Sequence, residues 1–167
     1  AAYADKRDVM SGATFAQEHV TFTAGPGEEF WLDFLSDTGD GFPAMATVAT
    51  LLGRPVLEVD GLTLPRGRVL LLGGDEVYPV AGVRAYEERL EAPLAAQFVP
   101  GDAQAPTVVA IPGNHDWYDG LTAFLRVFCQ GRDLAGWRTV QRRPYFALAL
   151  PHGWWVLAID IQLDTYI

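Results

Sequence analysis

Apolar residues in this chain occur in short blocks that alternate with segments in which they repeat every three or four positions. Blocks of strand length occupy residues 30–36, 68–73 and 107–111, and each of them stops at a turn rich in Gly and Asp. A segment with a helical repeat follows each turn. Such an alternation is typical of folds in which helices cover a largely parallel sheet. We therefore expect these three strands to lie parallel within an α/β fold.

Proline positions and apolar spacing predict the helices. Pro43 suits the first turn of a helix over about 43–52 that ends at Gly53. A second helix is expected over 82–98, and Pro93 should kink or divide it. Its apolar stripe consists of Val83, Tyr86, Leu90 and Leu94. The stripe of the third helix, which is expected to face the sheet, consists of Leu121, Phe124, Leu125, Phe128 and Cys129.

Two hairpins are predicted outside this alternation. Asp60-Gly61 separates two short apolar pieces, which indicates either a two-residue hairpin or a surface loop. The segments 145–150 and 154–159 are joined by a Pro-His-Gly turn and are expected to pair as antiparallel strands. Trp154 and Trp155 would alternate between the faces of the second strand, so we expect one of them in the core. The fold class is therefore α/β, a layered sandwich of mixed β-sheet with flanking helices.

Composition sets the domain organisation and excludes several classes of partner. With 167 residues, of which 50% are hydrophobic, the chain can bury one sizeable core. We expect an N-terminal extension over 1–29 and one domain over 30–167. The net charge of -9 argues against broad nucleic-acid binding, and no apolar run is long enough for a membrane segment. The single Cys129 suits reducing surroundings such as the cytoplasm, but the sequence indicates neither compartment nor oligomeric state.

The three Gly- and Asp-rich turns are the candidate functional site. Parallel strands place their carboxyl ends along one edge of a sheet, where open α/β folds bind their ligands. Converging carboxylates repel one another unless a cation or a proton neutralises them. The turns therefore predict a cation site at this edge. The side chains that they supply are Asp37, Asp40, Asp75, Glu76, Tyr78, Asn114, His115 and Asp116.

The middle turn is the most informative of the three. Asp75 follows Gly73-Gly74 at a strand end, where small residues let the backbone bend and bring a carboxylate into the crevice. An Asp in this place can bridge two cations, and the phenol oxygen of Tyr78 could reach the same centre. Taken alone, the same residues could instead cap a turn and pack on the sheet. The neighbouring turns favour the metal-binding interpretation.

The third turn adds an amide, an imidazole and a carboxylate. Asn114 can bind a cation through its neutral amide oxygen, and His115 can donate a proton or stabilise phosphate charge. Asp116 is expected to orient His115, and Asp119 is expected to cap the following helix. Trp117 and Tyr118 could wall a substrate pocket or pack against the neighbouring helix.

The three turns carry short motifs: Asp-Thr-Gly at 37–39, Gly-Asp-Glu-Val-Tyr at 74–78 and Gly-Asn-His-Asp at 113–116. These motifs resemble the first three motifs of the calcineurin-like metallophosphoesterases. They are most similar to the purple acid phosphatase branch. The resemblance implies a binuclear hydrolase of small phosphoesters that uses two ions of Mn, Fe, Zn or Mg. It assigns Asp37 and Tyr78 to one ion, Asp75 to both and Asn114 to the second. His115 would contact the phosphate or the leaving group, with Asp116 beside it.

The chain also departs from the pattern of this family. The family's late histidine motifs are absent before Ile167, so we expect only the N-terminal part of a metallophosphoesterase-like domain. His19 and His152 are expected to be surface or packing residues instead. Without the late ligands, the alternative function is a non-catalytic module that binds metal or phosphate.

Three further assignments concern charged residues near the turns. Asp37 is favoured over Asp40 as the ligand of the first turn, because only Asp37 fits the Asp-x-Gly pattern. Glu76 is expected to point to solvent. The basic residues that we expect at a solvated strand edge are Arg138, Arg142 and Arg143.

Overall fold

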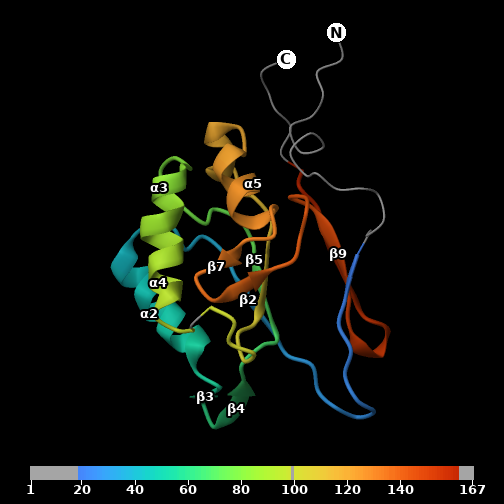
Figure 1. Ribbon diagram of the computed structural model, residues 1–167. Helices are drawn as coiled ribbons and strands as arrows, with labels where there is room; N and C mark the ends of the chain where they lie inside the picture. The colour runs from blue at the N-terminus through green and yellow to red at the C-terminus, as the bar shows by residue number, and fades with distance from the viewer. Residues whose placement is uncertain (1–18, 99, 162–167) are drawn as a thin grey trace.

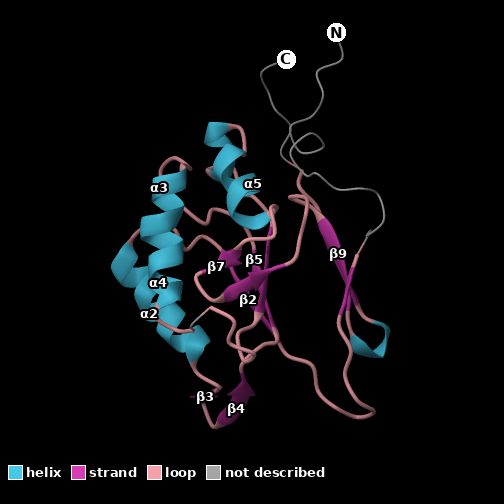
Figure 2. Cartoon of the chain, viewed as in Figure 1, coloured by secondary structure: helices cyan, strands magenta, loops and turns pink. Residues whose placement is uncertain are grey.

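The computed structural model describes residues 19–98 and 100–161 (Figure 1). Helices cover one face of a central five-stranded sheet, and a smaller three-stranded sheet lies on the other side (Figure 2). The predicted α/β class with mixed sheets is thereby confirmed. No helix in the described part of the chain is long and apolar enough to cross a membrane.

The central sheet has the strand order β2-β5-β6-β8-β7. Its strands are β2 Leu32–Leu35, β5 Val69–Leu72, β6 Thr107–Ala110, β8 Trp137–Thr139 and β7 Asp133–Leu134. The three predicted strands are parallel, as expected, and Leu35, Leu72 and Ala110 pair in register at their carboxyl ends. The loops that follow β2, β5 and β6 therefore leave the sheet from one level of one edge.

The strands β7 and β8 were missed by the sequence analysis. They contain two and three residues, and the turn between them places Ala135 and Gly136 at φ 52° and 95°. Such short strands carry too few residues to show an alternation of apolar and polar positions. Beyond β8, Gln141 extends the sheet, because its side-chain amide exchanges two hydrogen bonds with the backbone of Ala110 at 2.6 and 2.8 Å.

The helical layer contains the three predicted helices. They are α2 Phe42–Gly53, the composite helix α3 Val83–Tyr86, η1 Glu87–Glu91 and α4 Ala92–Ala95, and α5 Thr122–Phe128. The expected division of the second helix is confirmed: Pro93 lies in the first turn of α4, directly after the π-helical segment η1. Two short 3-10 turns, η2 Asp116–Asp119 and η3 Pro151–Gly153, are the other helical elements of the described residues.

The π-helical segment keeps one side of the composite helix turned toward the sheet. Tyr86, Leu90 and Leu94 are spaced by four residues, and all three are fully buried. A four-residue repeat drifts around an α-helix of 3.6 residues per turn, whereas a π turn contains more residues and counteracts that drift. Val83, the first member of the predicted stripe, is 38% exposed instead.

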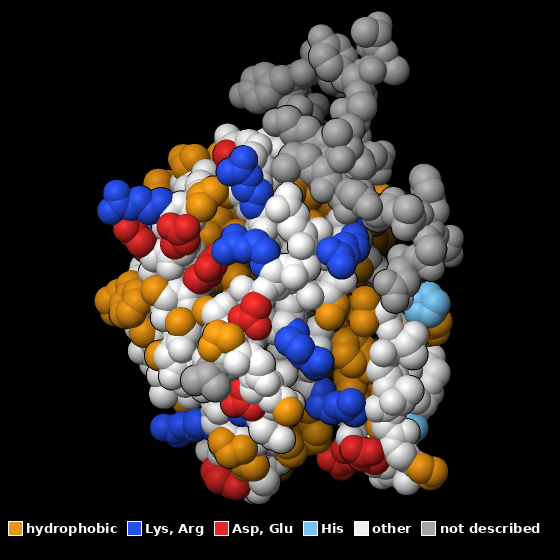
Figure 3. All heavy atoms as spheres, in the orientation of Figure 1, with side chains coloured by type: hydrophobic (Ala, Val, Ile, Leu, Met, Phe, Trp, Pro, Cys, Tyr) orange, Lys and Arg blue, Asp and Glu red, His pale blue; other side chains and the backbone are white. Residues whose placement is uncertain are grey.

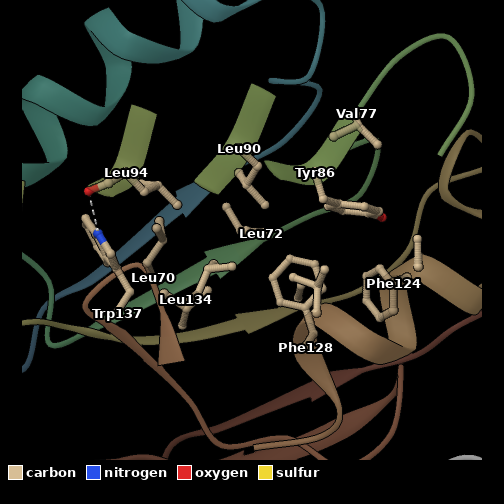
Figure 4. Packing of buried hydrophobic residues seen from close by; sticks show 14 of the residues in the cluster. Leu70, Leu72, Val77, Tyr86, Leu90, Leu94, Phe124, Phe128, Leu134 and Trp137 are labelled. Atoms are coloured by element: carbon tan, nitrogen blue, oxygen red, sulfur yellow. Dashed lines mark hydrogen bonds between the residues drawn. The ribbon is translucent and has the colours of Figure 1, made fainter. Parts of the chain in front are cut away.

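The larger core lies between the helices and the central sheet. Leu70 and Leu72 of β5 face Leu90, Leu94 and the aromatic residues of α5 (Figure 4). The whole predicted stripe of α5 is buried: Leu121, Phe124, Leu125, Phe128 and Cys129. Burial of such side chains, at about 1.5–3 kcal/mol each relative to exposure, is what holds the helices on the sheet.

The smaller sheet has the order β1-β9-β10, with β1 Val20–Thr21, β9 Phe146–Ala149 and β10 Trp155–Ala158. The predicted antiparallel hairpin of β9 and β10 is confirmed. Residues 20–21, which belong to the predicted extension, pair in parallel with β9, and residues 1–18 lie outside the described residues. A second apolar cluster around Val69, Leu71, Val109 and Leu148 joins the two sheets.

The expectation that Trp154 or Trp155 lies in the core is wrong. Their side chains are 72% and 54% exposed. Trp154 precedes β10, and along β10 it is Val156 and Ala158 that turn toward the other sheet. The Asp60-Gly61 hairpin is confirmed as β3 Val56–Val59 and β4 Leu62–Pro65, with Asp60 and Gly61 both at positive φ.

Charged side chains are spread over the face shown in Figure 3, where basic and acidic groups alternate. Of the three arginines predicted at a solvated strand edge, two are exposed. Arg138 and Arg142 are exposed, whereas Arg143 is half-buried and lies over the ring of Tyr145.

Candidate functional site

The loops after β2 and β5 are held together mainly by their backbones. The Asp37 amide donates to the Gly74 carbonyl at 3.0 Å, and the Tyr78 amide donates to the Gly39 carbonyl at 3.1 Å. A Cβ atom on Gly39 would lie 2.1 Å from the Cα of Val77, so this approach requires glycine. The contact places the first predicted ligand beside the loop that carries the second.

Asp37 and Asp75 share an uncommon backbone conformation. Their φ angles are 57° and 55°, in the left-handed region, which Asp tolerates better than most residues. Such conformations recur at functional sites, where the surrounding structure holds them in place. Asp37 lies two residues after the end of β2, and Asp75 lies three residues after the end of β5.

The two carboxylates meet at one phenol. The Tyr78 hydroxyl lies 3.0 Å from Asp37 Oδ1 and 2.9 Å from Asp75 Oδ2. Since a hydroxyl carries a single proton, it can donate to only one of them at a time. Partial burial and the two carboxylates raise the pKa of Tyr78, so in the absence of a cation the phenol keeps its proton. The pKa of Asp37 is lowered by hydrogen bonds from Ser36 and Tyr78.

The loops after β5 and β6 are joined through side chains. The His115 amide donates to Asp75 Oδ1 at 3.0 Å, and the Asp75 amide donates to Asp116 Oδ2 at 2.8 Å. Gly113 lies directly against Asp75, since a Cβ at Gly113 would be 2.1 Å from Asp75 Oδ1. Asn114 is thus flanked by two residues that both contact the predicted bridging carboxylate.

Asp116 has a different role from the one we expected. It is fully buried, its Oδ2 also accepts from the Gly113 amide at 2.8 Å, and its Oδ1 accepts from the Tyr86 hydroxyl at 2.5 Å. The His115 ring is oriented instead by the Pro79 carbonyl, 2.6 Å from its Nδ1. The prediction that Asp116 orients the imidazole is therefore corrected, because its oxygens hold the loop backbones and Tyr86.

The contact between His115 Nδ1 and the Pro79 carbonyl determines the chemistry open to His115. A carbonyl oxygen can only accept, so Nδ1 carries the hydrogen and Nε2 is the nitrogen that remains for a ligand. The ring lies between Tyr78 and Tyr118, with centroids 4.4 and 4.8 Å away. It can accept at Nε2 when neutral and donate there when doubly protonated.

The two aromatic residues of the third loop have separate functions. Tyr118 is 57% exposed, stands beside His115 and accepts a hydrogen bond from the Asn114 amide nitrogen at 3.3 Å. It can form a wall of the site. Trp117 packs against the larger core, and its indole nitrogen donates to Asp160. The packing interpretation is thus confirmed for Trp117, and the pocket wall stays a prediction for Tyr118.

One carboxylate in these loops lies elsewhere than the sequence predicted. Glu76, expected in solvent, is buried, and its Oε1 accepts from the Gly74 amide at 3.1 Å. Burial first, and then the nearby charge of Asp116, raises the pKa of Glu76 well above its usual value. Asp40 is exposed, and it is Asp37 that contacts Tyr78. Asp119 accepts from the Ala123 amide in the first turn of α5, as predicted.

The donors around Tyr78 are a suitable but sparse set for a cation. Carboxylate, phenol and amide oxygens are hard ligands that suit Mg and Mn, and a phenolate also suits Fe. Among residues 19–98 and 100–161, no group of three or more His, Cys, Asp or Glu could hold a metal ion. His19 and His152 lie by the smaller sheet, against Trp155 and the Glu28 carbonyl. Of the four predicted metal ligands, the structure brings Asp37, Asp75 and Tyr78 into contact, whereas the side chain of Asn114 contacts Tyr118.

Comparisons of the chain with protein-family models, curated proteins and solved structures found no match. Any functional assignment therefore depends on the chemistry of the three loops. Their most distinctive property is that two acidic side chains from separate strands share one phenol hydroxyl.

Proposed function

We propose that this protein is a metal-dependent hydrolase of small phosphoesters, with a binuclear metal centre at the carboxyl ends of β2, β5 and β6. One observation carries the proposal. Asp37 and Asp75 approach the same Tyr78 oxygen at 3.0 and 2.9 Å from two different strand ends. Two negative groups held this close favour a positive charge between them.

The proposed ligands follow from this arrangement and from the three sequence motifs. Asp37 and Tyr78 would bind one ion, Asp75 would bridge both, and Asn114 would bind the second through its amide oxygen. Ions of Mn, Fe, Zn or Mg suit a centre of this kind, which lowers the pKa of bound water and offsets phosphoryl charge. The motif resemblance to calcineurin-like metallophosphoesterases supports the same assignment, together with a metallophosphoesterase-like arrangement of the α/β layers.

His115 would serve as the proton donor. With Nδ1 bonded to the Pro79 carbonyl, the doubly protonated ring can present its Nε2 hydrogen to a substrate oxygen. Transfer of that proton to the departing alkoxide leaves an alcohol and a neutral imidazole that still donates from Nδ1. Asp116 contributes through the backbone of the loops, so we assign it as a positioning residue and not as a catalytic one.

The second candidate function is a non-catalytic module that binds metal or phosphate. The absence of a His-rich group in the described part of the chain favours it. Oxygen ligands alone can hold an ion without completing the environment that hydrolysis requires. The two candidates differ in turnover and agree in metal binding.

Metal-stripped protein should be titrated with Mn²⁺ by calorimetry and then assayed with p-nitrophenyl phosphate. The hydrolase proposal predicts metal uptake and hydrolysis that EDTA abolishes. Uptake without turnover on any phosphoester would select the binding module. Hydrolysis that is equally fast in stripped and loaded protein would contradict both.

A further inference from the structure

Tyr86 connects the helical layer to the candidate site. Its ring is fully buried in the larger core and packs edge-on against Phe128, with centroids 6.0 Å apart. Figure 4 shows the hydroxyl directed away from Leu72 and Leu90, toward the end of the core beside Val77. That hydroxyl donates to Asp116 Oδ1 at 2.5 Å. One side chain therefore belongs to the apolar core at its ring and to the polar loops at its tip.

The other oxygen of Asp116 joins two loops. Its Oδ2 accepts from the amides of Asp75 and Gly113, both at 2.8 Å. Asp75 returns the contact, since its Oδ1 accepts from the His115 amide at 3.0 Å. Each loop thus has a backbone amide that donates to a carboxylate of the other loop. The Tyr86 hydroxyl holds one of these carboxylates, that of Asp116, in place.

We propose that Tyr86 is a positioning residue that sets the separation between the loops of Asp75 and Asn114. The inference rests on the proposed function, in which these two residues bind the metal ions. Tyr86 acts on both loops through Asp116. Rotation of the Asp116 carboxylate would loosen the Asp75 and Gly113 amides together, because one oxygen holds both.

The composite helix explains how Tyr86 can hold this place. Tyr86 is the last residue of α3, and the π-helical segment begins at the next residue. The π turn keeps Tyr86, Leu90 and Leu94 on one side of the composite helix, and the hydroxyl of Tyr86 extends from that side to Asp116 in the loops. Such π turns inside helices are frequent at functional sites.

The test uses Tyr86→Phe, which removes the hydroxyl and keeps the ring. Amide hydrogen exchange, measured by NMR on metal-free protein, should become about tenfold faster at Asp75 and Gly113. Exchange in the strands, at Leu71 and Val109, should stay within about twofold of wild type. The Mn²⁺ dissociation constant should rise about tenfold, because the ligands lose their fixed spacing.

Tyr145→Phe is the matched control, since it removes a hydroxyl near the smaller sheet and should change neither measurement. Unchanged exchange at Asp75 and Gly113 in Tyr86→Phe would overturn the inference. Faster exchange with unchanged Mn²⁺ affinity would also overturn it, because the loops would then move without affecting the ligands. If wild-type protein takes up no Mn²⁺ at all, the proposed function fails, and the exchange measurement still decides whether Tyr86 holds the loops.

Discussion

The two junctions between the site loops are built from different groups. Between the loops after β2 and β5, backbone amides donate to backbone carbonyls, and the carboxylate of Asp37 stays exposed. Between the loops after β5 and β6, the carboxylates of Asp75 and Asp116 accept the backbone amides. Asp116 is fully buried in this second junction.

This difference separates Asp37, whose exposed carboxylate can serve a ligand, from Asp116, whose carboxylate serves the fold. Asp75 combines both roles, because its Oδ1 accepts from the His115 amide while its Oδ2 lies beside the Tyr78 hydroxyl. An exposed carboxylate such as Asp37 can exchange water for a cation at little cost. A buried carboxylate that already accepts three hydrogen bonds, as Asp116 does, must keep them, because each group left unpaired costs about 1–3 kcal/mol. The sequence around an Asp does not reveal whether its carboxylate will be exposed, like that of Asp37, or buried, like that of Asp116.

The largest effect is expected for Asp116→Ala. It leaves the Tyr86 hydroxyl and two backbone amides without their acceptor, so the free energy of unfolding should fall by about 3 kcal/mol or more. Urea unfolding measures the change, and the exposed Asp40→Ala should lose less than about 0.5 kcal/mol. Equal losses in the two variants would show that the buried junction does not stabilise the fold.

A smaller effect, on catalysis alone, is expected for His115→Gln. Without the proton donor, kcat for p-nitrophenyl phosphate hydrolysis should fall about a hundredfold, and the Mn²⁺ dissociation constant should stay within about twofold. The control is His152→Gln, which changes an exposed histidine beside the smaller sheet. A variant at position 115 that retains full kcat would remove His115 from the reaction.

Asp75→Asn should weaken Mn²⁺ binding about tenfold, since it removes the charge that is proposed to bridge two ions. The amide oxygen can still accept from the His115 backbone, so the loop junction is kept. Asp40→Asn, in the neighbouring loop, should leave the dissociation constant within about twofold of wild type. A calorimetric titration in which both variants lose affinity equally would refute Asp75 as the bridging ligand.

The smallest effect concerns Glu76 and the pH dependence of stability in metal-free protein. Because the pKa of Glu76 is raised in the folded state, the folded protein holds this proton more tightly than the unfolded chain. Its contribution is therefore fully present at acid pH and is lost as the pH rises toward the raised pKa. Glu76→Gln cannot titrate, so wild type should lose stability relative to this variant as the pH rises from about pH 4 toward neutral.

Thermal unfolding at several pH values would measure this difference. The exposed Glu87→Gln should follow the wild-type curve. If the Glu76→Gln variant also follows the wild-type curve, the pKa of Glu76 is the same in the folded protein as in solvent. The buried junction would then carry more negative charge than we infer.

Much of the fold could be predicted from local patterns. The strands at β2, β5 and β6, the stripe on α5 and both hairpins leave a clear repeat or turn signal over several residues. The strands β7 and β8 could not be predicted, since their pairing depends on a partner strand and not on their own few residues. Trp155 is exposed because it lies on the side of β10 opposite to Val156, and Trp154 is exposed because it precedes the strand. The alternation of residues alone tells neither which side faces inward nor where the strand begins.

The site was predicted as a set of residues, and its internal contacts were not. That Asp37, Asp75 and Tyr78 come together follows from two neighbouring parallel strands, β2 and β5, that end in register. That Glu76 is buried, that Pro79 holds the His115 ring and that Tyr86 reaches Asp116 follows from distances between segments far apart in the chain. No nearby sequence signal marks Tyr86, which has the spacing of an ordinary core residue.

Spacing along the chain is enough to predict where strands stop, which helix faces are apolar and which loops carry acidic groups. It does not predict which of those acidic groups are buried and which stay exposed, because the environment of a carboxylate is set by the amides and hydroxyls that other segments bring to it. Asp37 and Asp116 come from similar Gly- and Asp-rich loops, and only Asp116 has Tyr86 and two backbone amides around it.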